Sequence, residues 1–418
     1  MFSRVPLTDL FAMLAGPEVR KTNARNLALW SEAYRRASDR EDVTINYLLQ
    51  LWNVEAIEPL ARQLTEAVQR FPKSETIHTL WAEFPLTWGD PQEAVRRTEV
   101  MLAKFPSSEA LRYRAYQIYL SYGDFDAARK MALRLFEGTG YEEYSALASL
   151  ADKYKEVQAA WAVQPAVRDY HIYCIGLDRQ PRRFQRVQAQ LQRMGATVKR
   201  VSGVDGRTLP DLASRMLTHS ASSRMKGTLG CFLSHVRVWE LCVQSDKPYA
   251  FVTEDDTCFL LPPPPSTEFL NTDRREFDLC FVNERTQNAG YLSEQASFDQ
   301  PLPLGTILPH EVEGFRGIGT DGYFVSREAA RKLLDMVGQD GLVGDVDWRL
   351  MLYAVSDDEI DATKNEFIRE TLKMHRGYRK SSGKLETLIT APAIVRTYNG
   401  GSIRGLMNDF DHAHEEKA

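Results

Sequence analysis

The sequence predicts a chain of two parts, an all-α helical-repeat unit followed by an α/β unit. Features of the first part recur at an interval of 34 residues, whereas the second part alternates strand-like apolar runs with helix-like amphipathic runs. At 418 residues, the chain also exceeds what one hydrophobic core usually supports. We place the first unit at residues 1–164 and the second at residues 168–407, and we expect residues 408–418 to form a disordered tail.

The repeat rests on two recurring pairs. Phe-Pro at 71–72 returns at 105–106, and Gly-Asp at 89–90 returns at 123–124, each 34 residues later. This period resembles the tetratricopeptide repeat, in which helix pairs that cannot bury their apolar faces alone stack into a solenoid. A degenerate earlier copy is expected at residues 39–70.

The second unit opens with a strand, a helix and a second strand. Residues 171–177 form an apolar run typical of a buried strand. In the helix that follows, apolar residues recur three or four apart from Phe184 to Met194, and Gly195 supplies a C-terminal stop. A short strand is expected at residues 197–201. Acidic turns at the ends of these strands are typical of the first half of a nucleotide-binding sheet.

A further helix is predicted from the apolar spacing of residues 232–243. Gly230 at its start would let the backbone approach a ligand closely, and free amide groups there would attract an anion. Ser234 and His235 would then lie in the first turns. Such a pair is more commonly an ordinary hydroxyl beside a satisfied imidazole than a catalytic pair.

The strongest chemical signal is the triplet Glu254-Asp255-Asp256, which closes the apolar run at residues 249–252. Three consecutive carboxylates are not tolerated inside a buried strand, so they must stand at its C-terminal end, where open α/β sheets bind ligands. Their oxygens suit Mg²⁺ or Mn²⁺ held together with a substrate diphosphate. An isolated acidic triplet is more commonly a solvated turn, but the order of glycine, helix, strand and triplet favours a metal site.

The remaining elements are read from shorter signals. Ser326 is placed to cap a helix, and another helix is expected from Asp347 to about residue 354. The charged stretch at residues 356–388 is expected to be mobile, and residues 283–312 to form a long loop over the site. Strands are predicted at 278–282 and 323–325, with a final extended piece at 392–397.

Several motifs, in this order, resemble glycosyltransferase family 25, which includes bacterial lipopolysaccharide galactosyltransferases and animal collagen galactosyltransferases. The resemblance covers about residues 168–407 and implies a nucleotide-sugar domain of the GT-A type. The motifs are Leu-Asp-Arg at 177–179, Val-Asp-Gly at 204–206, Gly-Cys-Phe-Leu-Ser-His at 230–235, the triplet at 254–256, Gly-Thr-Asp-Gly-Tyr-Phe-Val-Ser at 319–326, Val-Asp-Trp at 346–348 and Ser-Ile at 402–403.

The resemblance implies a metal-dependent, inverting transfer of a hexose, galactose or glucose, from a UDP-sugar to a hydroxyl group of a glycan or lipopolysaccharide. Mn²⁺ or Mg²⁺ would be held by Asp256 with Glu254. Inversion requires a carboxylate base near the acceptor hydroxyl, for which Asp347 is the first candidate and Asp321 the second. Either could instead be a helix cap. The expected contacts to the UDP-sugar come from Asp178, Arg179, Arg183, Asp205, Ser234, Glu254, Asp255 and Arg404.

Two alternatives stay open at this point. The helical repeats could recruit a protein or peptide acceptor, or the chain could be a non-catalytic adaptor that senses a nucleotide-sugar. The net charge of −5 provides no basic surface for nucleic acid. We expect no signal peptide and no transmembrane segment, and the five cysteines, odd in number, favour reduced thiols and a cytoplasmic location.

Overall fold

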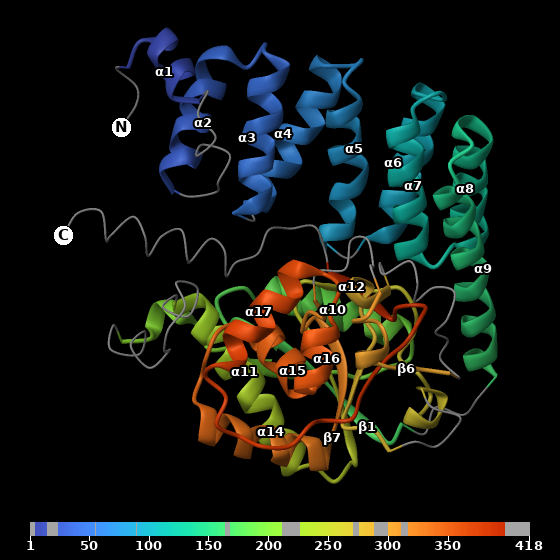
Figure 1. The fold of residues 1–418 in the computed structure, drawn as a ribbon. Coiled ribbons are helices and arrows are strands. Elements are labelled where there is room, and N and C mark those ends of the chain that lie inside the picture. The colour runs from blue at the N-terminus through green and yellow to red at the C-terminus, as the bar shows by residue number, and fades with distance from the viewer. Residues whose placement is uncertain are drawn as a thin grey trace.

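The structure is a computed structural model that describes residues 5–14, 24–54, 56–88, 90–163, 168–210, 226–270, 276–287, 300–310 and 317–397. The predicted tail at 408–418 and the expected nucleotide contact Arg404 lie outside these residues. Within them, an array of helices precedes a mixed α/β sheet (Figure 1). None of the described helices combines the length and apolar character needed to cross a membrane.

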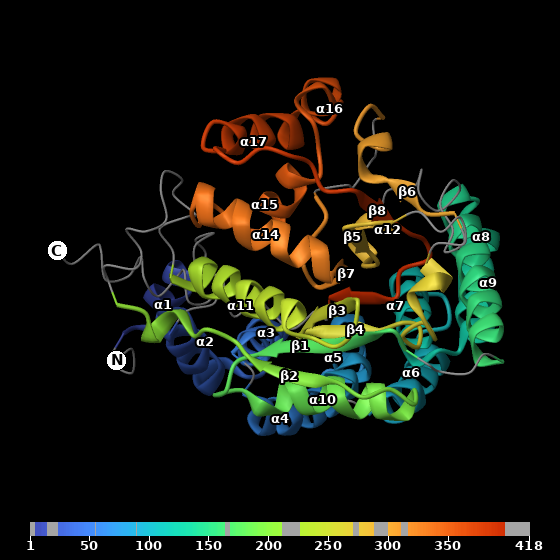
Figure 2. The ribbon, with the colours of Figure 1, turned by 90° about the horizontal axis from the view of Figure 1, so that it is seen from below.

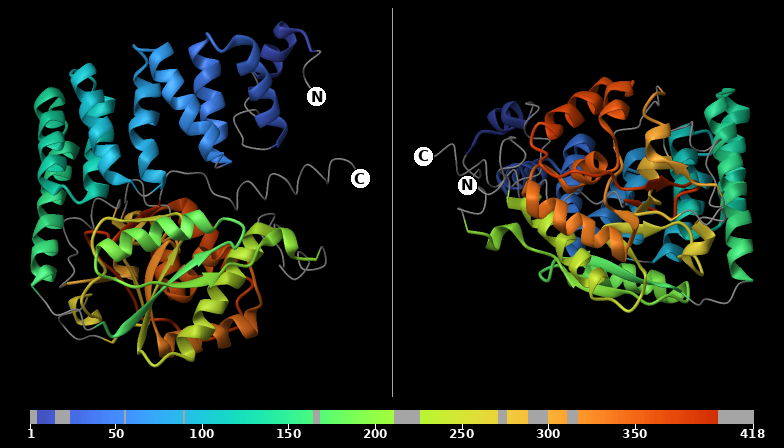
Figure 3. Two further views of the ribbon diagram at one scale, coloured as in Figure 1. Left: turned by 180° about the vertical axis from the view of Figure 1, so that it is seen from behind. Right: turned by 60° about the horizontal axis from the view of Figure 1, so that its bottom comes forward.

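In the N-terminal part, helices that follow one another in sequence stand side by side (Figure 1). The last of them, α9, runs from the array down to the α/β part (Figure 3). The helices are α1 (Leu7–Leu14), α2 (Ala24–Ala37), α3 (Glu41–Asn53), α4 (Ile57–Arg70), α5 (Glu75–Glu83), the 3-10 helix η2 (Phe84–Trp88), α6 (Pro91–Lys104), α7 (Glu109–Tyr122), α8 (Phe125–Thr139) and α9 (Glu142–Ala162).

The 34-residue period corresponds to one helix pair. The hydroxyl groups of Ser74 and Ser108 cap α5 and α7, each accepting a hydrogen bond from the backbone N–H three residues later. The carboxylates of Asp90 and Asp124 cap α6 and α8 in the same way. The recurring residues therefore set the helix starts, which is consistent with a helical-repeat unit.

The α/β part contains a seven-stranded mixed sheet of order β2-β1-β3-β7-β5-β8-β6 and a two-stranded sheet of β4 and β9, within the described ranges. Strands β2, β1 and β3 are parallel, and β7 is antiparallel to both β3 and β5. The strands are β1 (Tyr170–Gly176), β2 (Lys199–Ser202), β3 (Tyr249–Glu254), β4 (Thr257–Phe259), β5 (Leu279–Phe281), β6 (Leu302–Pro303), β7 (Gly322–Ser326), β8 (Thr387–Ile389) and β9 (Val395–Thr397).

Helices cover both faces of this sheet, with α11 and α14 on one side and α10 on the other (Figure 2). The faces follow the alternation of strand side chains, because Tyr173 and Ile175 join the core beneath α11 whereas Ile172 and Cys174 join the core beneath α10. The helices are α10 (Pro181–Arg193), α11 (Lys226–Val243), α12 (Glu284–Gln287), α14 (Arg327–Asp340), α15 (Val346–Tyr353), α16 (Asp357–Ala362) and α17 (Glu366–Arg376), with 3-10 turns η3 (Gly206–Thr208), η6 (Thr267–Leu270) and η7 (Leu304–Thr306).

One apolar cluster, which we name the shared cluster, continues from the helical array into the α/β part. It joins buried side chains of α7, α8 and α9, among them Tyr116 and Trp161, to sheet residues such as Phe251 and Phe324. Cys258 of β4 likewise packs in a second cluster made by α5, η2, α6 and α7. The two parts are therefore held together by buried apolar contact.

The structure corrects three expectations from sequence. The second strand spans Lys199–Ser202 rather than 197–201, and α11 begins at Lys226, so that Gly230 lies inside the helix and not at its start. Residues 356–388, expected to be mobile, contain α16, α17 and the first residues of β8. Helix α16 starts with a capping box of Ser356 and Glu359, a local signal that the charged composition obscured.

Candidate functional site

Strand pairing brings the distant motifs to one edge of the sheet. Glu254, the last residue of β3, is in register with Ile175 near the end of the parallel strand β1. Thr253 is in register with Gly322, the first residue of the antiparallel strand β7. The acidic triplet at the end of β3, the turn after β1 and the residues just before β7 are therefore neighbours.

This edge is also the switch point of the sheet. The chain passes from β1 to β2 on one side and later enters β3 on the other side of β1. In open α/β sheets, a crevice that binds ligands forms outside the carboxyl ends of the strands at this point. The predicted C-terminal position of the acidic triplet is confirmed, because Glu254 ends β3 and the next two residues form a turn.

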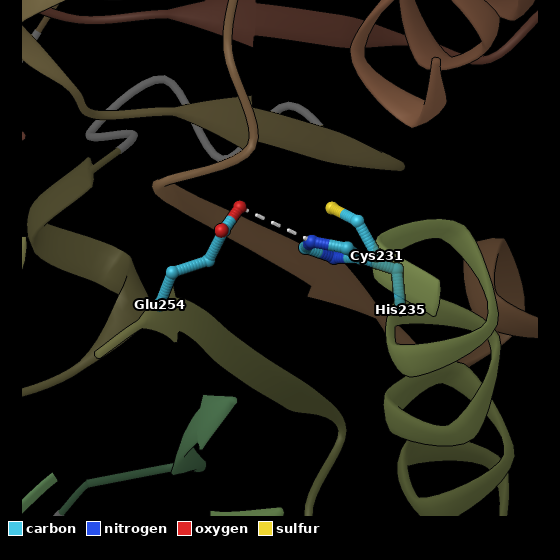
Figure 4. A group of neighbouring side chains, drawn as sticks. All are labelled: Cys231, His235 and Glu254. Atoms are coloured by element: carbon cyan, nitrogen blue, oxygen red, sulfur yellow. Dashed lines mark hydrogen bonds and ion pairs between the residues drawn. The ribbon is translucent and has the colours of Figure 1, made fainter. Parts of the chain in front are cut away.

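Glu254 is held in place by two side chains. Its Oε1 accepts a hydrogen bond of 3.0 Å from the Thr320 hydroxyl. The same oxygen lies 3.4 Å from Nε2 of His235 (Figure 4). The His235 ring is fully buried, and its Nδ1 is 3.0 Å from the hydroxyl of Tyr323. That hydroxyl accepts a hydrogen bond of 3.0 Å from Nε1 of Trp239. A hydrogen-bonded series of side chains thus fixes the direction of the Glu254 carboxylate.

Asp255 turns away from Glu254, toward β1 and α10. Its Oδ1 lies 3.2 Å from Nη1 of Arg183, and its backbone oxygen accepts a hydrogen bond of 2.8 Å from Arg186. A side chain at Gly176 would place a Cβ 2.9 Å from Oδ2 of Asp255, so only glycine leaves room for the carboxylate. Burial raises the pKa of Asp255 to about 7, although Arg183 opposes the shift.

Asp256 and Asp321 present buried carboxylate oxygens at the same edge. Oδ1 of each has no hydrogen-bond partner among the described residues. Oδ2 of Asp321 accepts a hydrogen bond of 2.6 Å from Thr397. Burial raises the pKa of Asp321 to about 6, and it also raises the pKa of Asp256, where the charge of Glu254 adds to the effect.

These two oxygens, which receive no hydrogen bond from a described residue, fit a cation. A buried carboxylate oxygen without a donor is costly, and an ion with oxygen-preferring coordination would remove that cost. Asp256 lies two residues after Glu254, and the two carboxylates influence each other electrostatically. The residues present are therefore of the kind that Mn²⁺ or Mg²⁺ requires.

The two candidate bases flank one arginine. Oδ1 of Asp321 lies 3.8 Å from Nε of Arg285, and Oδ2 of Asp347 lies 3.7 Å from Nη1 of the same side chain. Asp347 is in the first turn of α15, but the N-cap residue is Asp345. Sequence reasoning missed Arg285; its signal was a basic residue shortly after the predicted strand at 278–282.

The expected nucleotide contacts have partners within the protein. Asp178 accepts a hydrogen bond of 2.9 Å from Ser202 and forms an ion pair of 2.8 Å with Arg200. Ser234 is buried in the middle of α11, where its hydroxyl accepts from the backbone N–H of Val204 and donates to the backbone oxygen of Gly230. Ser234 thus joins α11 to the turn after β2 rather than marking a helix start.

Gly230 of α11 lies at the same contact between the helix and the turn after β2. A Cβ at Gly230 would come within 2.4 Å of the backbone oxygen of Val204, so the glycine permits close packing of α11 against the backbone of that turn. The prediction of an anion site at a helix start beside Gly230 is therefore wrong. Asp205, in the same turn, pairs with Arg179 and Arg207. Partial burial opposes its ionisation, but hydrogen bonds from both arginines outweigh it and lower its pKa to about 2.

Of the arginines expected to contact the UDP-sugar, Arg179 and Arg183 lie within the described residues, and each pairs with a carboxylate, as does the neighbouring Arg182. Arg179 pairs with Asp205 and Arg183 with Asp255, whereas Arg182 reaches Glu58 of α4 at 2.6 Å. The first turn of α10 therefore connects the candidate site to the helical array. The ion pair with α4 is exposed on both sides and contributes little stability by itself.

Comparison with known proteins identifies the second part of the chain. Residues 169–346 match the family model described as glycosyltransferase family 25, lipopolysaccharide biosynthesis protein. The chain is 34% identical over 173 residues to "Inactive glycosyltransferase 25 family member 3" of Mus musculus, covering 39% of this chain and 28% of the mouse protein.

Two insect proteins, each named "Glycosyltransferase 25 family member", are also similar. The one from Drosophila pseudoobscura pseudoobscura is 33% identical over 100 residues, covering 21% of this chain and 16% of its own length. The one from Drosophila melanogaster is 25% identical over 219 residues, covering 48% and 33%. The chain thus spans a third or less of the length of these relatives. The family model and these relatives show that residues 169–346 form a glycosyltransferase family 25 domain.

Proposed function

We propose that the chain is a metal-dependent, inverting glycosyltransferase that transfers a hexose, galactose or glucose, from a UDP-sugar to a hydroxyl group of a glycan or lipopolysaccharide. The observation that carries the proposal is the group of carboxylates from Glu254, Asp256 and Asp321 at the switch point of the sheet. The parallel first half of the sheet supports a GT-A-type domain at residues 168–407. The 34-residue helix pairs support a tetratricopeptide-like unit at residues 1–164.

The positions of the site residues indicate which of them would hold the metal ion and which would bind the nucleotide. Asp256 and Glu254 would hold the metal ion, which when bound would neutralise the charge that develops on the leaving diphosphate. Asp178, Arg179, Arg183 and Asp205 follow the ends of β1 and β2, where the UDP group would lie.

Asp347 is the better candidate for the base. Its side chain keeps 17% of its surface exposed, whereas that of Asp321 keeps 5% and is tied to Thr397. An acceptor hydroxyl must come within hydrogen-bond reach of the base, which the more accessible carboxylate permits. The backbone oxygen of Asp321 instead accepts hydrogen bonds from the hydroxyl groups of Thr253 and Thr257, which connects this residue to β3 and β4.

The direct test is UDP release. The purified chain is incubated with Mn²⁺ and a panel of UDP-sugars, with and without glycan acceptors, and free UDP is measured. We expect acceptor-dependent release with one sugar, and loss of release when EDTA removes the metal. Full activity in EDTA would contradict the metal-dependent mechanism.

A second candidate function is a non-catalytic protein that binds a nucleotide-sugar. The name of the mouse relative, which describes that protein as inactive, motivates it. In the same assay, tight UDP binding without release for any sugar would favour this alternative. Release only with a peptide acceptor would favour recruitment through the helical array, whose helix α4 contacts α10 beside the site.

A further inference from the structure

Three side chains with metal-binding atoms converge beside the proposed cation site. Sγ of Cys231, a ring nitrogen of His235 and a carboxylate oxygen of Glu254 all lie within 4.8 Å of one another. Figure 4 shows the first two projecting from α11 toward the end of β3, which carries the third. We propose that Cys231, His235 and Glu254 form a binding site for a borderline-soft divalent cation of the Zn²⁺ class, distinct in chemistry from the Mn²⁺ or Mg²⁺ site.

The spacing on the helix supports this site. Cys231 and His235 are four residues apart, which places both side chains on one face of α11. Glu254 reaches them from a strand end that is paired on both sides. With bond lengths of about 2.0 to 2.3 Å, tetrahedral ligand atoms are about 3.5 Å apart. The separations between the three ligand atoms, which extend to 4.8 Å, would therefore contract by at most about 1.3 Å when a cation binds.

Two of the three ligands also have the outer partners that metal ligands require. Nδ1 of His235 is 3.0 Å from the Tyr323 hydroxyl, whose oxygen can accept both this N–H and that of Trp239. In the metal-bound form the proton would lie on Nδ1, and the cation would replace the hydrogen bond of 3.4 Å between Nε2 and Oε1 of Glu254. The Thr320 hydroxyl donates a hydrogen bond to Oε1 of Glu254, the same oxygen that faces His235, and so holds the carboxylate in place.

The donor set selects the ion. Thiolate and imidazole ligands favour Zn²⁺ and Co²⁺ over Mg²⁺ and Mn²⁺, which prefer oxygen alone. Three protein ligands leave one position open for water or another small ligand. Because Glu254 belongs to both sites, Zn²⁺ would compete with the hard cation for that carboxylate.

The test uses Co²⁺ as a spectroscopic probe on the full chain. We expect about one equivalent to give intense visible bands of tetrahedral geometry and a thiolate-to-cobalt charge-transfer band, both removed by Zn²⁺. Co²⁺ on oxygen ligands alone gives neither. Cys231→Ser should abolish the charge-transfer band, whereas Cys258→Ser, at a cysteine that packs against the helical array, should keep it.

A second measurement needs no variant. Zn²⁺ should slow the alkylation of Cys231 by iodoacetamide about tenfold or more, as followed by mass spectrometry, whereas Mg²⁺ should not. Absence of the charge-transfer band in the wild-type chain, its persistence in Cys231→Ser, or unprotected alkylation would overturn the proposal. If UDP is released in the presence of Mn²⁺ but Co²⁺ gives no charge-transfer band, only the site of Cys231, His235 and Glu254 is refuted. If Co²⁺ gives the band but no UDP is released, only the proposed enzymatic activity is refuted.

Discussion

His375 should make the stability of the α/β part depend on pH. The residue lies in α17 with 4% of its surface exposed, and its ring stacks on Trp348 with the ring centroids 6.5 Å apart. Its Nδ1 is buried without a hydrogen-bond partner among the described residues. Burial, assisted by the charge of Arg349, lowers the pKa of His375 to about 4 from the ordinary 6.5.

The magnitude and the sign follow from proton linkage. A lowered pKa means that the unfolded chain binds the proton before the folded chain does. The contribution of neutral His375 to the unfolding free energy is therefore complete above pH 6.5, decreases as the pH falls, and is lost below about pH 4. Each pKa unit corresponds to about 1.4 kcal/mol, so the total loss is about 3 kcal/mol.

Urea unfolding at several pH values between 7 and 4 measures this loss. His375→Gln cannot take up the proton, so its unfolding free energy should fall by about 3 kcal/mol less than that of the wild type over this range. His310→Gln, at an exposed histidine, is the matched control and should follow the wild type. Parallel curves for wild type and His375→Gln would refute the assignment of the buried neutral ring.

Three further predictions concern the site and its support. Asp256→Asn should leave the circular dichroism unchanged but remove several kcal/mol of transition-state stabilisation from metal-dependent UDP release; near-normal release would remove Asp256 from the mechanism. Asp347→Asn should lower the rate of sugar transfer about 10² to 10⁴-fold and leave the affinity for the donor unchanged. Asp321→Asn should raise the KM for the donor and lower kcat less than Asp347→Asn does. The opposite result would make Asp321 the base. Gly230→Ala should lower the unfolding free energy by about 3 kcal/mol, because its Cβ would lie 2.4 Å from the backbone oxygen of Val204. Gly338→Ala in α14, a position with open space around it, is the control and should leave the unfolding free energy unchanged or slightly higher. Equal effects of the two substitutions would show that close packing does not explain Gly230.

The elements with strong local signals could be predicted from the sequence. The apolar run before Glu254 placed the triplet at a strand end, because buried strands exclude adjacent charges. The recurrence of Asp90 as Asp124 predicted helix pairs, since both residues cap helix starts. Ser326 caps α14 as its type and position indicated.

What the sequence could not supply depends on contacts between distant segments. Gly230 looked like a helix start because a glycine in a helix is locally unfavourable, and only the backbone of Val204 explains it. Arg285 became relevant because the register of β7 brings Asp321 to the end of β3. The convergence of Cys231 with Glu254 likewise requires α11 to cross the sheet at that edge.

The shared cluster has a consequence for how any partner of the helical array would be presented. Separating the two parts would expose large aromatic residues, including Tyr116 and Trp161, so the array cannot act as a freely swinging tether. A molecule bound along the helices would instead sit at one set distance and direction from the end of β3. The distance from that bound molecule to the site would then be fixed, so an acceptor too short or too long to span it would not react, even with a suitable hydroxyl group.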